Sequence, residues 1–231
     1  MLKNIDGLHH IDYARYLWAK PNSFDKQLDF QNTGFVYGPI RLSARNQLAA
    51  KLLVRPASEL DFVKDKTAIF FIRDPRDILV SSYYSFGFNH PLNPIPEKRK
   101  EQLKRRKAIQ ALTLDEYVLA YADQQIEYFD HLKAVAASCK KKAILRYEDM
   151  IDDFDLFIDE FQKVVPLNQY LIREIYKRSR PRKNISNAAH RRSGATRRFL
   201  KDLQSETIVQ LNAKLAQTLS DFEYEDIDHR D

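Results

Sequence analysis

The chain has 231 residues, a formal net charge of +6 and 44% hydrophobic residues, enough for one substantial globular domain. No apolar run approaches the roughly 18–20 residues that span a bilayer, and the N-terminus lacks the apolar core of a signal peptide. The single cysteine, Cys139, excludes an internal disulfide and gives no metal cluster. We therefore expect a cytoplasmic protein that binds no metal and has no membrane partner.

Three elements are predicted before the first long apolar run. Residues 1–30 are rich in aromatic side chains and predict helix, with an end expected near Pro21. Residues 34–37 predict a short strand, and residues 43–54 carry leucines at the spacing of one helix face.

The stretch FFIRDPRDILVSSYYSF, residues 70–86, predicts a strand, a tight turn and a helix. Residues 68–72 are apolar and rich in aromatic and β-branched side chains, as in a strand buried on both faces. Asp74 can cap the helix, Pro75 suits its first position, and Asp77 in the first turn complements the helix dipole.

Arg73 stands between the strand and this helix, and two interpretations of it remain open. The carboxyl ends of strands in open α/β sheets bind ligands, and helix N-termini there attract phosphate. Alternatively, Arg73 only forms a salt bridge to Asp77 beside the helix cap. Arg76 is expected either to face solvent or to pair with an acidic residue.

The rest of the chain alternates between helices and one further strand. Residues 87–97 predict a loop with three prolines, and a long helix follows over 113–138, capped by Thr113 or Asp115. A second buried strand is predicted at 143–145, and helices at 152–163, 167–178 and 205–220. Alternating strands and helices predict a single α/β domain over residues 1–231, with three layers and a parallel sheet flanked by helices.

Positive charge is concentrated in two stretches. Residues 97–107 hold seven basic and two acidic residues, a pattern typical of a solvated helix face. Residues 178–198 hold eight basic and no acidic residues, and proline, asparagine and glycine break the segment into loop. Arginines clustered on a loop favour binding of an anion.

Three segments together carry a resemblance to a known family. In the first, Ser81 follows Arg73 by eight residues; the second, LRYEDMIDDF, holds Tyr147; the third, HRRSGATRRFLKDL, holds Arg192 and Gly194. In this order and spacing they resemble sulfotransferases that use 3′-phosphoadenosine-5′-phosphosulfate (PAPS), over roughly residues 34–220. The third segment is a degraded form of the family's RKGxxGDW loop, with Ser193 in place of lysine and Phe199 in place of tryptophan.

The resemblance implies a fold, a cofactor and a set of binding residues. The fold would be similar to that of P-loop nucleotide hydrolases. The cofactor would be PAPS, and its product adenosine 3′,5′-bisphosphate. An arginine guanidinium can donate to two oxygens of a terminal phosphate at once, and a serine hydroxyl can donate to the third. The residues implied for the 3′-phosphate are Arg73, Ser81, Arg191, Arg192 and Gly194, and Tyr147 would contact the adenine.

Two features of the family are absent from the sequence. The glycine-rich PKSGTT-type loop that cradles the 5′-phosphosulfate has no counterpart, since Gly7 is the only glycine before residue 34. We expect an N-terminally shortened copy of the domain; the alternative is a protein that has dispensed with this loop. The usual base is also missing, because no His, Asp or Glu lies between Phe30 and Ser58.

His90 is the best remaining candidate for that base in the sequence, and the alternative is that it is a loop histidine packed beside Pro91. His9 and His10 are a second possibility. His131 is more typical of a structural residue, and His190 of one that assists the arginine loop.

The leading hypothesis is a sulfotransferase acting on a hydroxyl or amine of a small-molecule or carbohydrate acceptor. The alternative is a non-catalytic homologue that binds a nucleotide or another anion. Nucleic acid is not expected as a partner, because no nucleic-acid-binding module is recognisable. The sequence indicates neither the acceptor nor the oligomeric state.

Overall fold

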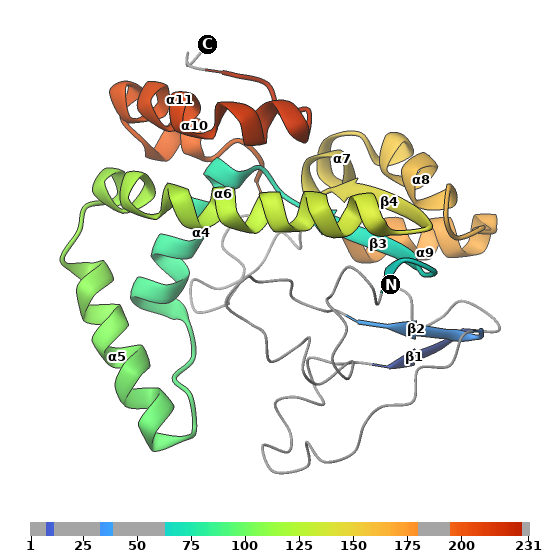
Figure 1. The fold of residues 1–231 in the computed structure, drawn as a ribbon, viewed down its shortest axis with the longest axis horizontal. Helices are drawn as coiled ribbons and strands as arrows, with labels where there is room; N and C mark the ends of the chain where they lie inside the picture. The colour runs from blue at the N-terminus through green and yellow to red at the C-terminus, as the bar shows by residue number, and fades with distance from the viewer. Residues whose placement is uncertain (1–7, 12–32, 39–62, 180–194, 228–231) are drawn as a thin grey trace. The chain divides into compact units, whose positions relative to one another are not determined.

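The computed structural model describes residues 8–11, 33–38, 63–179 and 195–227 (Figure 1). The helix predicted over 43–54 and the arginine-loop residues 180–194 lie outside these ranges. The chain divides into two compact units. The first comprises Met1–Phe70, Asp130–Leu145 and Asp155–Ser179, and the second comprises Phe71–Phe129, Arg146–Phe154 and Arg180–Asp231.

The described strands form small parallel sheets. β1 (His9–Ile11) pairs in parallel with β2 (Phe35–Tyr37), which confirms the strand predicted over 34–37. The helix predicted over 1–30 is wrong at His9–Ile11. There the His9 ring lies 5.3 Å from the ring of its cross-strand partner Phe35, a tertiary contact that local helix propensity does not register.

β3 (Thr67–Ile72) pairs with β4 (Lys141–Arg146), and both predicted strands are therefore confirmed. The expected burial of the first strand on both faces is wrong, because Phe70 and Ile72 are buried whereas the intervening Phe71 is 53% exposed. β3 leads into α4, and β4 leads into α7 (Figure 1). The two strands are parallel neighbours, so the residues after their carboxyl ends lie at one edge of the sheet. Arg73 and Tyr147 occupy these two positions.

Helices make up most of the described residues. The predictions at 113–138, 152–163, 167–178 and 205–220 are confirmed with small shifts at their ends. The short helix α7, which ends one residue before Asp153, was not predicted. The loop predicted at 87–97 is shorter than expected. The π-helix η2 overlaps its beginning, and the basic helix α5 starts within its last two residues. The helices are α4 (Pro75–Tyr84), η2 (Ser85–Asn89), α5 (Pro96–Gln110), α6 (Leu114–Ser138), α7 (Tyr147–Asp152), α8 (Phe154–Gln162), α9 (Gln169–Ser179), α10 (Phe199–Asp202) and α11 (Ser205–Asp221).

The predicted caps of the two central helices form as their sequences indicate. Asp74 caps α4 by accepting a hydrogen bond from the Arg76 backbone N–H at 2.9 Å, with Pro75 at the first helical position. At the start of α6, Thr113 Oγ1 accepts from the Glu116 N–H while the Glu116 carboxylate accepts from the Thr113 N–H. This reciprocal pair is a capping box.

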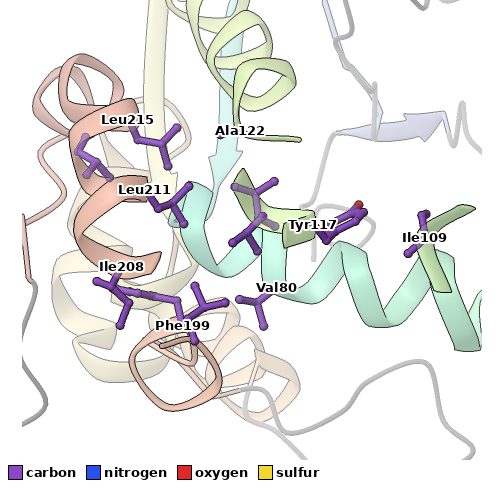
Figure 2. Packing of buried hydrophobic residues seen from close by; sticks show 12 residues of the cluster. Val80, Ile109, Tyr117, Ala122, Phe199, Ile208, Leu211 and Leu215 are labelled. Atoms are coloured by element: carbon purple, nitrogen blue, oxygen red, sulfur yellow. The ribbon is translucent and has the colours of Figure 1, made fainter. Parts of the chain in front are cut away.

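An apolar core cluster lies among the described residues of the second unit. It combines α4, the end of α5, the first part of α6, α10 and α11. In Figure 2, Phe199 and Ile208 lie beside Val80, and Leu211 and Leu215 continue the same cluster. Phe199 is fully buried, so the short helix that follows the arginine loop is fixed to α4 by packing.

Candidate phosphate-binding site

Arg73 lies at the centre of the candidate site, in the second unit. Its Nη2 donates hydrogen bonds to Asp77 Oδ2 and to the Ala195 carbonyl, each at 3.0 Å. Its guanidinium carbon lies 4.8 Å from the centre of the Tyr147 ring. The sequence-predicted residues Arg73 and Tyr147 are therefore brought together by adjacent strand ends.

The Nε atom of Arg73 is buried and has no hydrogen-bond partner among the described residues. A buried N–H without an acceptor costs roughly 1–3 kcal/mol. The salt bridge that the sequence offered as an alternative is present, and the guanidinium retains this N–H as a donor for a further acceptor. The two interpretations of Arg73 are thus compatible.

Asp77 links Arg73 to the segment that follows the arginine loop. Its Oδ2 accepts from Arg73 and its Oδ1 accepts from the Phe199 backbone N–H at 3.0 Å. Burial raises the pKa of the Asp77 carboxyl, and the Arg73 guanidinium partly opposes that rise. Asp77 therefore joins the carboxyl end of β3 to the start of α10.

Arg76 is buried and pairs with the acidic residue Asp74, so it does not face solvent. Its Nε and Nη2 donate to the two oxygens of Asp74 at 3.0 and 2.7 Å. Its Nη1 donates to Asn212 of α11, and its guanidinium carbon lies 4.1 Å from the centre of the Phe199 ring. Arg76 thus serves the packing of α4 against α10 and α11, and is only 1% exposed.

Glu148, in the segment that contains Tyr147, forms a second link to the start of α4. Its Oε1 accepts from the Asp74 backbone N–H at 3.1 Å, and its Oε2 accepts from the Tyr224 hydroxyl at 3.3 Å. Burial raises the pKa of the Glu148 carboxyl, and the bond from Asp74 opposes the rise. Sequence reasoning missed this residue, whose only signal is its place directly after Tyr147.

The described end of the arginine loop has its own attachments. Thr196 Oγ1 donates to Asp152 Oδ2 at 2.9 Å, beside the Ala195 carbonyl that accepts from Arg73. Arg197 has a φ of 54°, in the left-handed region where glycine is least costly. In the motif RKGxxGDW this position belongs to the second glycine, so the backbone conformation suits glycine although the residue is arginine.

The structure describes two of the other predicted site residues, Ser81 and His90. Ser81 is exposed on α4. His90 is half-buried after η2; its N–H donates to the Ser85 carbonyl at 2.7 Å, and its ring lies 5.3 Å from that of Phe86. Arg191, Arg192 and Gly194 lie outside the described residues, as does His190.

No group of three or more His, Cys, Asp or Glu side chains in residues 8–11, 33–38, 63–179 and 195–227 is placed to bind a metal ion. None of the helices described in these ranges is long and apolar enough to span a bilayer.

Comparison with known proteins identifies the family. The Sulfotransferase domain family matches residues 57–219, which include both strand ends, α4, α5, α6 and the arginine loop. Comparison with curated proteins and with solved structures gave no match. Since the matched region covers more than half of the chain and contains Arg73 and Tyr147 in the predicted order, the chain belongs to the sulfotransferase domain family.

Proposed function

We propose that the chain binds PAPS and transfers its sulfuryl group to a hydroxyl or amine of a small-molecule or carbohydrate acceptor. The observation that best supports this function is the position of Arg73. It follows β3, lies against the Tyr147 ring, and has a buried Nε–H without a partner among the described residues. The proposed architecture is the three-layer, P-loop-like α/β fold that membership of the family implies.

The residues at this site suit a nucleotide 3′-phosphate. A guanidinium can bind two phosphate oxygens through separate N–H groups. The salt bridge to Asp77 fixes the orientation of Arg73, while the negative charge of Asp77 is shared with the Phe199 N–H. We assign Arg73, Ser81 and the loop residues Arg191, Arg192 and Gly194 to the phosphate, and Tyr147 to the adenine.

Bound PAPS would supply an activated sulfuryl group with adenosine 3′,5′-bisphosphate as the leaving group. The chain's own contribution would be to bind the nucleotide and to take the proton of the acceptor. We propose His90 for the second role, because a histidine titrates close to neutral pH. The backbone of His90 is fixed, since its carbonyl accepts from Arg106 of α5 and its N–H donates to Ser85.

A non-catalytic nucleotide-binding homologue is the second candidate. It is favoured by the absence of any His, Asp or Glu between Phe30 and Ser58, where this family usually places its base. The two candidates predict the same nucleotide site and differ only in turnover.

The binding experiment is calorimetric titration of adenosine 3′,5′-bisphosphate into the wild type and into Arg73→Ala. A hydrogen bond to a charged group contributes about 1.5–3 kcal/mol, so the substitution should raise Kd roughly 10- to 100-fold. Arg73→Lys keeps the charge and loses the planar fork, and should be intermediate. Arg173→Ala, at an exposed position on α9, removes the same charge and should leave Kd within about twofold.

The turnover experiment measures release of adenosine 3′,5′-bisphosphate from PAPS in the presence of hydroxyl- and amine-bearing acceptors. Acceptor-dependent release that is lost in His90→Ala, with nucleotide binding retained, supports the enzyme. Tight nucleotide binding without release on any acceptor supports the non-catalytic homologue. Absence of nucleotide binding by the folded wild type would contradict both.

A further inference from the structure

The basic helix α5 is attached to the rest of the second unit along one face. Gln102 Nε2 donates to the Pro91 carbonyl at 2.8 Å, and Gln110 Nε2 donates to the Gly87 carbonyl at 2.8 Å. Ile109 is fully buried, and its Cγ2 lies 3.0 Å from where a Cβ on Gly87 would be. These contacts fix the rotation of α5 about its axis and so determine which side chains it presents outward.

The outward face of α5 carries a row of positive charge. Lys100, Lys104 and Lys107 are spaced i, i+4 and i+7, and all three are exposed. At a rise of about 1.5 Å per residue, they extend over roughly 10 Å along one side of the helix. No ion pair joins these lysines to an acidic residue in the part of the chain that the structure describes.

The chemistry of this face limits what it can bind. α5 contains no aromatic residue, so it offers no ring on which a nucleic-acid base could stack. Its two glutamines, which could hydrogen-bond to base edges, already donate to the backbone carbonyls of Pro91 and Gly87. Leu103 is its only exposed large hydrophobic residue, at 39% exposure, too little for insertion into a membrane surface. What remains outward is closely spaced charge.

We propose that the row Lys100, Lys104 and Lys107 binds an anionic carbohydrate chain. The positive row complements a polymer that carries carboxylates or sulfates at regular intervals. The choice of carbohydrate rests on the proposed function, because such a chain also carries the hydroxyl groups that sulfuryl transfer requires. The proposed acceptor class is thus an anionic carbohydrate, and the lysine row is the surface on which it docks.

The experiment compares two variants that each lose three lysine charges. The test variant is Lys100→Gln/Lys104→Gln/Lys107→Gln. The matched control is Lys133→Gln/Lys140→Gln/Lys141→Gln, at exposed positions of the first unit. Binding of the full chain to immobilised polygalacturonate, neutral dextran and a DNA duplex is measured at several salt concentrations, with circular dichroism as a check on folding.

We expect the wild type to bind polygalacturonate but not dextran, with affinity that falls as salt rises. The test variant should bind at least tenfold more weakly, and the control should stay within about twofold of the wild type. Equal loss in both variants would overturn the proposal, because net charge alone would then explain binding. Tighter binding to DNA than to polygalacturonate, lost in the same variant, would also overturn it in favour of nucleic acid.

Titration with adenosine 3′,5′-bisphosphate separates this proposal from the proposed function. The test variant should bind the nucleotide as the wild type does, because α5 carries no residue assigned to the phosphate site. Absence of nucleotide binding together with selective loss of polygalacturonate binding would contradict the proposed function and support the lysine row as an anion-binding surface.

Discussion

Asp77 accepts a hydrogen bond from the backbone N–H of Phe199 at 3.0 Å, across 122 positions of sequence. The other oxygen of the same carboxylate accepts from Arg73. A single buried side chain thus couples the proposed phosphate-binding arginine to the end of the arginine loop. Substitution of Asp77 should therefore affect both the position of Arg73 and the attachment of Phe199.

Substitution of Asp77 separates these two roles. Asp77→Ala leaves the Phe199 N–H buried without an acceptor and should lower the free energy of unfolding by about 1–3 kcal/mol. Asp77→Asn keeps one carbonyl oxygen as an acceptor for that N–H, so its free energy of unfolding should fall by less. Urea denaturation of the three proteins provides the measurement. Equal losses in Ala and Asn would show that the bond to Phe199 contributes nothing.

Glu148 should make stability depend on pH. Its pKa in the folded state is raised above the ordinary value of 4.5, so the folded state binds its proton more tightly than the unfolded state. Its contribution to the free energy of unfolding therefore increases as pH falls through the folded-state pKa, and becomes constant below 4.5.

In Glu148→Gln that contribution is absent, while an acceptor for the Asp74 N–H is retained. The wild type should thus gain stability relative to the variant as pH is lowered from neutral toward 4.5. Chemical denaturation at a series of pH values measures the difference, in which other titrating groups cancel. Parallel curves for the two proteins would rule out a raised pKa for Glu148.

Arg197 offers a test of backbone strain. Its φ of 54° costs a residue with a Cβ roughly 1–2 kcal/mol relative to glycine. Arg197→Gly and Arg197→Ala both remove the exposed 3.4 Å ion pair with Glu225, but only the glycine variant removes the Cβ. The glycine variant should be more stable than the alanine variant by up to about 1 kcal/mol, because glycine's larger unfolded-state entropy offsets part of the relief. Thermal unfolding would refute the strain if the alanine variant were the more stable.

The local structure around Arg73 could be predicted because its signals are close together in sequence. Asp74 and Pro75 specify a helix start, and the apolar run before them specifies a strand. Thr113 with Glu116 specifies a capping box in the same way. In each case the interacting groups lie within four residues of one another, so no knowledge of the tertiary fold was needed.

The parts that could not be predicted depend on contacts between distant segments. The sequence left open whether Arg76 faces solvent or pairs with an acidic residue, and its burial depends on Phe199 of α10 and Asn212 of α11. The bonds of Glu148 to Asp74 and Tyr224 likewise join segments separated by more than 70 residues. The helix predicted at 1–30 is wrong at His9–Ile11 for the same reason, since pairing with β2 decides the conformation there.

The contribution of the 3′-phosphate to nucleotide binding is the most direct test of the role of Arg73. Adenosine 3′,5′-bisphosphate and adenosine 5′-phosphate are titrated into the wild type and into Arg73→Ala, and the ratio of the two Kd values is compared between proteins. We expect a wild-type preference for the bisphosphate of roughly 10- to 100-fold that largely disappears in Arg73→Ala. A preference that persists in the variant, or that is absent from the wild type, would contradict the assignment of Arg73 to the 3′-phosphate.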